Sequence, residues 1–251
     1  MRKVTILSIA LAIQTIVLSA QTNQQSKPSI IKISKELLAG EGLSAIKQED
    51  PERRFFQKRV YNGTDLAVYM VAIGSGITNE FESFPMEEFI FWKNGKALVE
   101  PINEEAFPIF AGDYFIQAKG FQGKWNFIGD GELHLELSVI ARNRSASSGP
   151  SPISKALVID RDLLSGVSNK KEIYTGVELT VNMLTAGKLE FEGTTKERML
   201  HIVNGVITIT QSGEEPIKCY PGEFIILREG FEGRWESQSL QPLRILEIYR
   251  S

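Results

Sequence analysis

One stretch of the chain occurs twice, and this repeat limits the folds that the chain can adopt. Residues 120–125 (GFQGKW) return 110 positions later as residues 230–235 (GFEGRW). The same offset matches Gly112 with Gly222, Asn94-Gly95 with Asn204-Gly205, and Glu87 with Glu197. Upstream, an offset of 113 matches Tyr61-Asn62-Gly63 with Tyr174-Thr175-Gly176. A repeat of this length predicts one folding unit built twice.

Both copies consist of short strand-like segments separated by turns. Residues 66–72 and 89–92 are rich in β-forming side chains, and residues 133–139 alternate between apolar and polar ones, which is typical of a strand with one buried face. The Asn94-Gly95 pair indicates a hairpin. We therefore expect an all-β protein of two tandem jelly-roll β-barrels. An immunoglobulin-like sandwich is the alternative, disfavoured because Cys219 is the only cysteine.

Changes in composition mark the predicted boundaries. Residues 1–20 have a basic start and an apolar run, which predicts a signal peptide cleaved after Ala20. An uncleaved membrane anchor is the alternative, but the run is short for a span and contains Gln14. The following predicted segments are a lead with one short helix at 21–54, a first barrel at 55–142, a Ser/Pro/Gly-rich linker at 143–155 and a second barrel at 156–251. We expect a periplasmic or secreted protein with no membrane contact after cleavage.

The charge balance bears on the partners of the chain. The formal net charge is −3, and no cluster of Lys and Arg stands out in the sequence. Nucleic-acid binding needs a basic surface that neutralises phosphates. We therefore expect a small-molecule ligand and no nucleic-acid partner.

The glycine spacing resembles that of the cupin superfamily. The second cupin motif runs Gly, five residues, Pro-x-Gly, two residues and His. Here Gly112 leads to residues 118–120 (AKG) and then to Gly123, and Gly222 leads to residues 228–230 (REG) and then to Gly233. The resemblance covers residues 55–141 and 156–250 and implies a two-cupin chain. The Gly-Phe-x-Gly-x-Trp ending is similar to that of cupins related to ureidoglycine aminohydrolase and ethanolamine utilisation.

The histidines of a cupin metal site are missing from both copies. The first cupin motif ends in Glu, six residues and Gly, which fits Glu88 and Gly95, whereas copy two has Arg198 in the Glu position. The positions of the family's ligand histidines hold Glu82, Phe84 and Gly123 in copy one, and Glu192, Thr194 and Gly233 in copy two. If the gap in the first motif is one residue longer, its two histidine positions hold Phe81 and Ser83, or Phe191 and Gly193, and neither alignment gives a histidine. Zinc, nickel and iron(II) need nitrogen or sulfur donors at three or four positions. We therefore expect no bound metal and no other cofactor.

The two histidines of the chain fall elsewhere. His134 lies on the strand face opposite Leu133, Leu135 and Leu137, and we expect that face to be exposed to solvent. His201 lies three residues after Arg198, so strand alternation points it away from the barrel interior. We expect His201 to be a packing or interface residue.

The cupin geometry implies two different pockets. In copy one, Glu82 and Glu88 with Trp92 and Trp125 would suit a cation, an amine or polyol hydroxyls. In copy two, Glu192, Thr194, Arg198 and Trp235 would suit an acidic or sugar-like ligand, since a Glu–Arg pair can be structural or can bind a carboxylate. The tryptophans either plug the barrels or form apolar pocket walls. Copy two is the better candidate for the acidic or sugar-like ligand.

Three functions remain open from the sequence. The first is a metal-free binding protein for a small polar metabolite such as a sugar, uronate or ureide. The second is a carboxylate-based hydrolase or isomerase that resembles the ureide-processing cupins, with Glu82 and Glu88 as its catalytic acid–base pair. The third is an assembly module, because Phe89, Phe91 and Met199 are predicted to face outward and could join the two halves or form a homodimer.

Overall fold

The computed structural model describes residues 29–47, 54–142, 157–159, 169–240 and 242–251. The predicted signal peptide and linker lie outside these ranges. The single helix of the described residues is α1 (Lys35–Leu38), which Ser34 caps at its N-terminus. No helix in the described part of the chain is long and apolar enough to span a membrane. The rest of the regular structure is β, as the sequence predicts.

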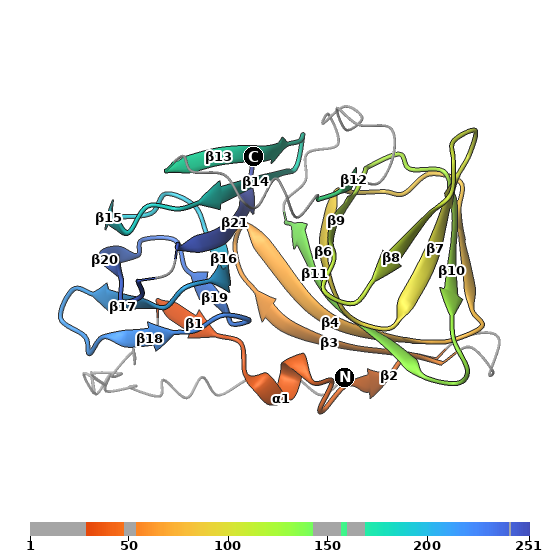
Figure 1. Ribbon diagram of the computed structural model, residues 1–251, viewed down its shortest axis with the longest axis horizontal. Coiled ribbons are helices and arrows are strands. Elements are labelled where there is room, and N and C mark those ends of the chain that lie inside the picture. The colour runs from red at the N-terminus through yellow and green to blue at the C-terminus, as the bar shows by residue number, and fades with distance from the viewer. Residues whose placement is uncertain (1–28, 48–53, 143–156, 160–168, 241) are drawn as a thin grey trace, which may run out of the picture.

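The strands form two pairs of sheets (Figure 1). In the first pair, the larger sheet has the order β12 (Leu157–Val158), β9 (Tyr114–Gln117), β6 (Glu88–Asn94), β11 (Leu133–Ala141), β4 (Leu66–Gly74), β3 (Phe55–Asn62) and β2 (Ser44–Ala45). Its smaller sheet has the order β5 (Thr78–Phe81), β10 (Gly123–Ile128), β7 (Lys96–Pro101) and β8 (Phe107–Phe110).

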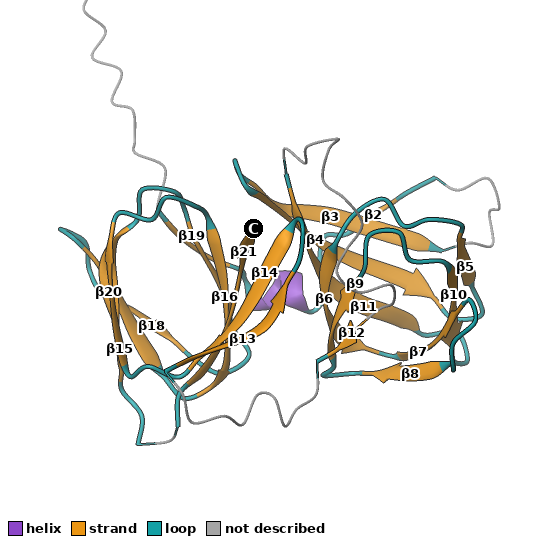
Figure 2. Ribbon diagram, turned by 90° about the horizontal axis from the view of Figure 1, so that it is seen from above, coloured by secondary structure: helices purple, strands orange, loops and turns teal. Residues whose placement is uncertain are grey.

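The second pair repeats this plan. Its larger sheet has the order β1 (Ile30–Lys32), β19 (Phe224–Leu227), β16 (Arg198–Asn204), β21 (Arg244–Arg250), β14 (Leu179–Leu184) and β13 (Lys170–Thr175). Its smaller sheet has the order β15 (Lys188–Glu192), β20 (Glu232–Ser237), β17 (Ile207–Gln211) and β18 (Ile217–Cys219). The strands of each pair curve around a common interior (Figure 2).

Two short strands cross between the pairs. Strand β1 precedes the first pair in the chain but pairs with β19 of the second. Strand β12 lies within the range that the sequence assigns to the second barrel, and it pairs with β9 of the first. Each pair therefore receives an edge strand from a segment next to the other pair in sequence.

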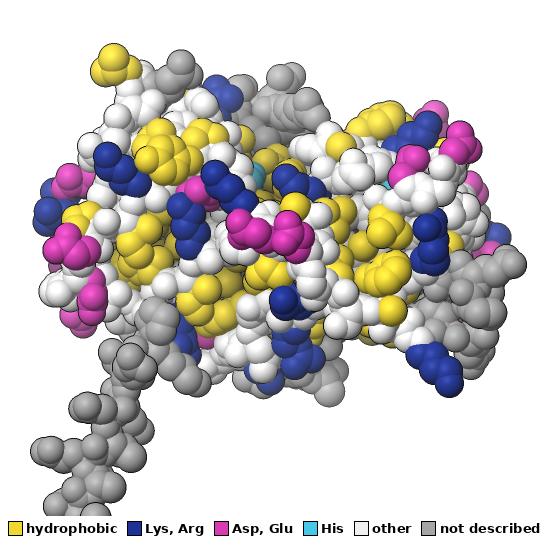
Figure 3. All heavy atoms as spheres, turned by 90° about the horizontal axis from the view of Figure 1, so that it is seen from below, with side chains coloured by type: hydrophobic (Ala, Val, Ile, Leu, Met, Phe, Trp, Pro, Cys, Tyr) yellow, Lys and Arg dark blue, Asp and Glu magenta, His cyan; other side chains and the backbone are white. Residues whose placement is uncertain are grey.

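Each sheet pair encloses an apolar core to which both of its sheets contribute. In the first, Trp92 and Phe115 from the larger sheet pack with Trp125 and Phe127 from the smaller one. In the second, the larger sheet contributes Leu200 and Ile225, and the smaller sheet contributes Ile209 and Trp235. On the outside, basic and acidic side chains are interspersed over the face that Figure 3 shows.

A third core lies between the two sheet pairs, where the outer faces of the two larger sheets meet. It contains Val68, Met70, Phe89, Leu137 and Val139 from one side and Val181, Met183, Met199, Phe224 and Ile248 from the other. Phe89, Phe91 and Met199, which the sequence predicts to face outward, lie in this core within one chain. A homodimer would therefore have to use another surface.

A reciprocal pair of glutamates joins the two sheet pairs. Glu197, which is 1% exposed, accepts hydrogen bonds from the Tyr61 hydroxyl (2.6 Å) and the amides of Thr64, Asp65 and Leu66 (2.9, 2.9 and 3.0 Å). Burial alone would raise the pKa of Glu197, but these hydrogen bonds outweigh it and hold the pKa below its usual value. The Glu197 carboxylate of the second sheet pair thus stabilises the β3–β4 turn of the first sheet pair.

Glu87 makes the mirrored contacts. It is fully buried and accepts hydrogen bonds from the Tyr174 hydroxyl (2.7 Å) and the amides of residues 177–179 (3.0, 2.8 and 2.9 Å). A Cβ atom at Gly63 would lie 2.1 Å from a Glu197 oxygen, and one at Gly176 would lie 2.2 Å from a Glu87 oxygen. The glycines of the repeated Tyr-x-Gly segment are therefore required by the carboxylates that approach them.

His201 lies in the third core, as predicted. Its ring stacks on Phe224 at 3.9 Å between centroids. Its Nδ1 atom lies 3.2 Å from the Glu223 carbonyl oxygen and its Nε2 atom 2.8 Å from the Tyr114 hydroxyl. Because a carbonyl can only accept, Nδ1 carries the hydrogen and Nε2 accepts from Tyr114. Burial lowers the pKa of His201 to about 3, so this histidine is neutral at physiological pH.

Candidate functional site

Polar side chains gather on the inner face of the larger sheet of the first pair. Glu88 on β6 lies opposite Gln117 on β9, and Glu136 and Ser138 follow on the neighbouring strand β11. The Ser138 hydroxyl donates a hydrogen bond to Glu88. Glu136 is 8% exposed and Gln117 is 1% exposed. Strand alternation explains the cluster, because the residues between these positions face the third core.

The two carboxyl groups of this cluster disfavour ionisation. Burial raises the pKa of Glu88 to about 7, against the lowering effect of the Ser138 hydrogen bond. Burial also raises the pKa of Glu136 well above its usual value, and the charge of Glu88 adds to this effect. Like charges that share a desolvated site cannot both ionise easily. Both carboxyl groups therefore hold a proton more tightly than an exposed glutamate does.

Several polar atoms in this interior are buried without a hydrogen-bond partner. They are Trp92 Nε1, Trp125 Nε1, His134 Nε2, Glu136 Oε2 and both side-chain polar atoms of Gln117. Buried polar atoms normally have partners, and each exception needs an explanation. Among the described residues of the second pair, the corresponding atoms are Arg198 Nε and Glu178 Oε1, and the latter lies 3.3 Å from Lys119 Nζ. The unpartnered atoms therefore favour the first sheet pair over the second as a ligand site.

Aromatic rings form the wall beside these polar atoms. The ring centroids of Trp92 and Trp125 are 6.1 Å apart, and Phe115 lies 4.8 Å from Trp125. Phe127 stacks on Trp92 at 5.8 Å. The indole N–H groups are the hydrogen-bonding atoms that this wall offers.

His134 is 1% exposed, so the prediction that it faces solvent is wrong. The seven-stranded sheet has two buried faces here, because Leu135 and Leu137 of β11 pack in the third core and the opposite face lines the interior. The backbone amide of Lys96 donates to His134 Nδ1 at 3.1 Å. The neutral ring therefore carries its hydrogen on Nε2, next to Trp92. Burial lowers the pKa of His134.

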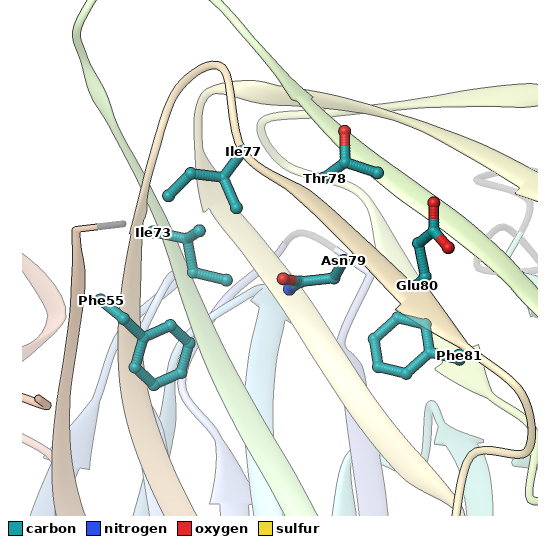
Figure 4. Close-up of a pocket in the computed structure, with 7 residues that line it drawn as sticks. All are labelled: Phe55, Ile73, Ile77, Thr78, Asn79, Glu80 and Phe81. Atoms are coloured by element: carbon teal, nitrogen blue, oxygen red, sulfur yellow. The ribbon is translucent and has the colours of Figure 1, made fainter. Parts of the chain in front are cut away.

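A pocket of about 530 Å³ opens beside this interior, between β3–β4 and β5 (Figure 4). Phe55, Ile73 and Phe81 form its apolar sides, and Asn79 points into the same space, whereas Thr78 and Glu80 point away from it. Ile73 is the register partner of His134, and Asn79 is that of Trp125. The pocket thus adjoins the strands that carry the unpartnered atoms.

The residues predicted for copy one separate in the structure. Trp92 and Trp125 are buried in the interior, and Glu88 faces it. Glu82 is exposed, just after the end of β5. The carboxyl group on which the charge of Glu88 acts is that of Glu136, and it raises the pKa of Glu136. The structure thus places Glu88, and not Glu82, on the same sheet face as Glu136, with Ser138 between them in the register.

The residues predicted for copy two also have other partners. Arg198 forms an ion pair with Glu247, which Asn182 binds at 3.1 Å. Glu192 is exposed at the end of β15, where it lines a groove of about 360 Å³. The Thr194 hydroxyl donates to the Arg228 carbonyl at 2.8 Å and accepts from the Phe231 amide at 3.1 Å, which stabilises a turn. Trp235 is fully buried and donates to the Ala186 carbonyl at 3.3 Å.

Sequence reasoning missed Glu136, Ser138 and Gln117. The signal for the first two is present, because they share a strand face with His134 in the alternating segment 133–139. The alternation alone assigns that face to solvent, which hides its polar residues as site candidates. Gln117 has no motif to mark it.

The residues present do not fit the metal centre that is typical of cupins. No group of three or more His, Cys, Asp and Glu side chains that could hold a metal ion occurs in the described ranges. A Cβ atom at Gly123 would lie 2.4 Å from the Glu100 carbonyl oxygen, and one at Gly233 would lie 2.3 Å from that of Thr210. The positions of the later histidine in both copies therefore have no room for a side chain.

The described residues form pairs of antiparallel sheets, and the side chains of both sheets of a pair fill the interior between them. Residues 177–240 match the EutQ-like cupin domain model. A putative glyoxylate-induced protein from Pseudomonas aeruginosa is similar over 90% of this chain and 89% of its own, with 14% identity and a TM-score of 0.63. A cupin 2 conserved barrel domain protein from Leptotrichia buccalis is similar over 82% and 92%, with 11% identity and a TM-score of 0.58.

A third similar structure holds a metal. It is HEPD from Streptomyces albus with 2-hydroxyethylphosphonate and Fe(II) bound, at 6% identity and a TM-score of 0.56 over 88% of this chain and 76% of its own. No curated protein matches the sequence. Residues 177–240 thus resemble a EutQ-like cupin domain, and the chain shares the fold of these cupin structures.

Proposed function

We propose that the chain is an exported two-barrel cupin that binds a small polar metabolite in the interior of the first sheet pair. The internal repeat and the two sheet pairs support the two-barrel organisation. The basic and apolar start of residues 1–20 supports export. N-terminal sequencing of the protein recovered from outside the cytoplasm checks this point, and an intact residue 1–20 segment there would count against it.

The observation that carries the proposal is the set of unpartnered polar atoms between the sheets. Two indoles and His134 offer N–H donors, Glu136 offers an acceptor and Gln117 offers both. A buried polar atom without a partner costs about 1–3 kcal/mol, and a ligand with donors and acceptors would recover that free energy. Sugars, uronates and ureides have such groups.

Metal-independent binding follows from the donor set. The family positions hold Glu82, Phe84 and Gly123 in the first pair, and Gly123 has a backbone carbonyl where a side chain would begin. We therefore propose that the protein's own polar side chains bind the ligand.

Thermal unfolding of residues 21–251 with a panel of polyols, uronates, ureides and amines tests the proposal. A ligand at one hundred times its Kd stabilises by about 2.7 kcal/mol, which raises Tm by roughly several degrees in a chain of this size. Gln117→Leu should abolish the shift, because it removes two of the unpartnered atoms. Gln122→Leu, at an exposed loop position, should keep it. A Tm that no compound raises would contradict the proposal.

A carboxylate-based hydrolase or isomerase is the second candidate, favoured by the coupled carboxyl groups of Glu88 and Glu136. General acid–base catalysis needs such groups with separated pKa values near the working pH. Glu136→Gln should then lower kcat for a ureide-type substrate by about 10²–10⁴-fold. Turnover that survives this substitution unchanged would exclude the pair as the catalytic groups.

A further inference from the structure

The buried acidic side chains of the described chain fall into two groups. Most have a cation or a set of backbone amides as partner. Glu223 lies 2.6 Å from Lys32 Nζ, Glu178 lies 3.3 Å from Lys119 Nζ, Glu247 pairs with Arg198, and Glu87 and Glu197 accept backbone amides. Glu136 and the half-buried Glu88 differ, because Glu88 has the Ser138 hydroxyl and Glu136 has an oxygen without a partner. Buried carboxylates normally have compensating charge or hydrogen bonds.

No positive side chain of the described residues compensates this pair. Arg59 on β3 is the cation on the same sheet face. Its guanidinium lies 5.4 Å from the centroid of the Tyr69 ring, and the residue is exposed to solvent. Tyr69 stands between Arg59 and Ser138 in the register of the sheet. His134, two residues before Glu136, is buried and its pKa is lowered, so it is neutral. The charge that acts on Glu136 is that of Glu88.

We propose that the ligand of the first sheet pair carries a protonated amine, which binds between Glu88 and Glu136 and faces the indole rings of Trp92 and Trp125. This inference rests on the proposed binding function. An ammonium group has three N–H donors and no acceptor, which matches carboxylate oxygens. Aromatic faces attract cations, and most strongly where water is excluded.

The donors of the same interior define the rest of the ligand. Trp92 Nε1 and His134 Nε2 are unpartnered and lie on rings whose centroids are 6.1 Å apart. Both carry hydrogens, so they require oxygen acceptors on the ligand. An amine together with hydroxyl groups satisfies the two sets at once. The ligand class is therefore an amino alcohol or an amino sugar alcohol.

Matched pairs of compounds test the charge of the ligand. Isothermal titration calorimetry of residues 21–251 should give a Kd for glucamine that is about tenfold lower than the Kd for sorbitol. In the same way, 3-amino-1-propanol should bind more tightly than 1,3-propanediol. Binding should release a proton, because the cation drives the carboxyl pair to ionise, so the measured enthalpy should change with the buffer's ionisation enthalpy. Affinity should rise as pH increases through about 7, where Glu88 loses its proton.

Substitutions separate this inference from the proposed function. Glu136→Gln keeps size and should remove the preference for glucamine over sorbitol, with Tm in the absence of ligand no lower than that of the unchanged chain. Glu82→Gln changes an exposed carboxylate and should leave the preference intact. Sorbitol that binds as tightly as glucamine would overturn the amine inference and leave the proposed function standing. Failure of all four compounds to bind, together with no response in the wider ligand panel, would overturn both.

Discussion

Glu197→Ala should lower the free energy of unfolding by about 4 kcal/mol. The substitution leaves the Tyr61 hydroxyl and the amides of Thr64, Asp65 and Leu66 without their acceptor. Each unsatisfied buried group costs about 1–3 kcal/mol, and such costs are not fully additive when the groups share one partner. Because Glu87 makes the mirrored contacts, Glu87→Ala should have an effect of the same size.

Urea unfolding of the variants measures this effect. Glu190→Ala is the control, because Glu190 is exposed and pairs with Lys188 on the surface; its effect should stay within about 0.5 kcal/mol. The stabilisation from Glu197 also depends on pH. Its folded pKa lies below the usual value, so the contribution is complete above about pH 4.5 and is lost as pH falls through the folded pKa. A loss of under about 1 kcal/mol in Glu197→Ala at pH 7 would show that the turn does not depend on this carboxylate.

The repeat makes the fold predictable from the sequence. Residue identities alone match Glu87 with Glu197 and the two Tyr-x-Gly segments with each other. The role of these residues cannot be predicted in the same way, because each glutamate binds the turn of the other copy. An alignment of two copies shows equivalent positions but does not show which copy supplies the partner.

The candidate site is only partly predictable from the sequence. The alternation of side chains along a strand separates its two faces but does not show which face is exposed to solvent. Alternation alone assigns the polar face of β11 to solvent, yet Glu136 is 8% exposed. The leucine face of the same strand packs in the core between the two sheet pairs. The pattern of a single strand cannot predict this contact, because the partner residues lie far away in the sequence. The partner of Arg198 is hidden for a similar reason, because Glu247 lies on β21, 49 residues away.

The two interiors diverged at equivalent register positions. Gln117 lies opposite Glu88 in the first pair, whereas Leu227 lies opposite Arg198 in the second. Arg198 is neutralised by Glu247, while Glu88 has no cation among the described residues. The second interior is thus closed by its own ion pair and apolar side chains. The first retains carboxyls and N–H groups that require a ligand.

Gly123→Ala should destabilise the chain by about 4 kcal/mol. The added Cβ would lie 2.4 Å from the Glu100 carbonyl oxygen, on the neighbouring strand, and the φ angle of Gly123 is +151°. Backbone strain of this kind costs about 1–3 kcal/mol and overpacking costs a similar amount. The backbone of β7 would have to move away from β10, since neither atom belongs to a flexible side chain.

This prediction bears directly on the missing metal site, because Gly123 occupies the position of a ligand histidine in the family. Gly123→His should therefore lose at least as much stability as Gly123→Ala, and zinc, nickel or manganese should not raise its Tm reversibly with EDTA. Gly120→Ala is the matched control in the turn that precedes β10, with φ of +87° and no atom within 4 Å of the added Cβ. It should cost only about 1–2 kcal/mol for its left-handed backbone. Equal losses of stability at Gly120 and Gly123 would mean that backbone conformation alone explains the glycine at position 123. The Glu100 carbonyl would then not exclude a histidine side chain from this position.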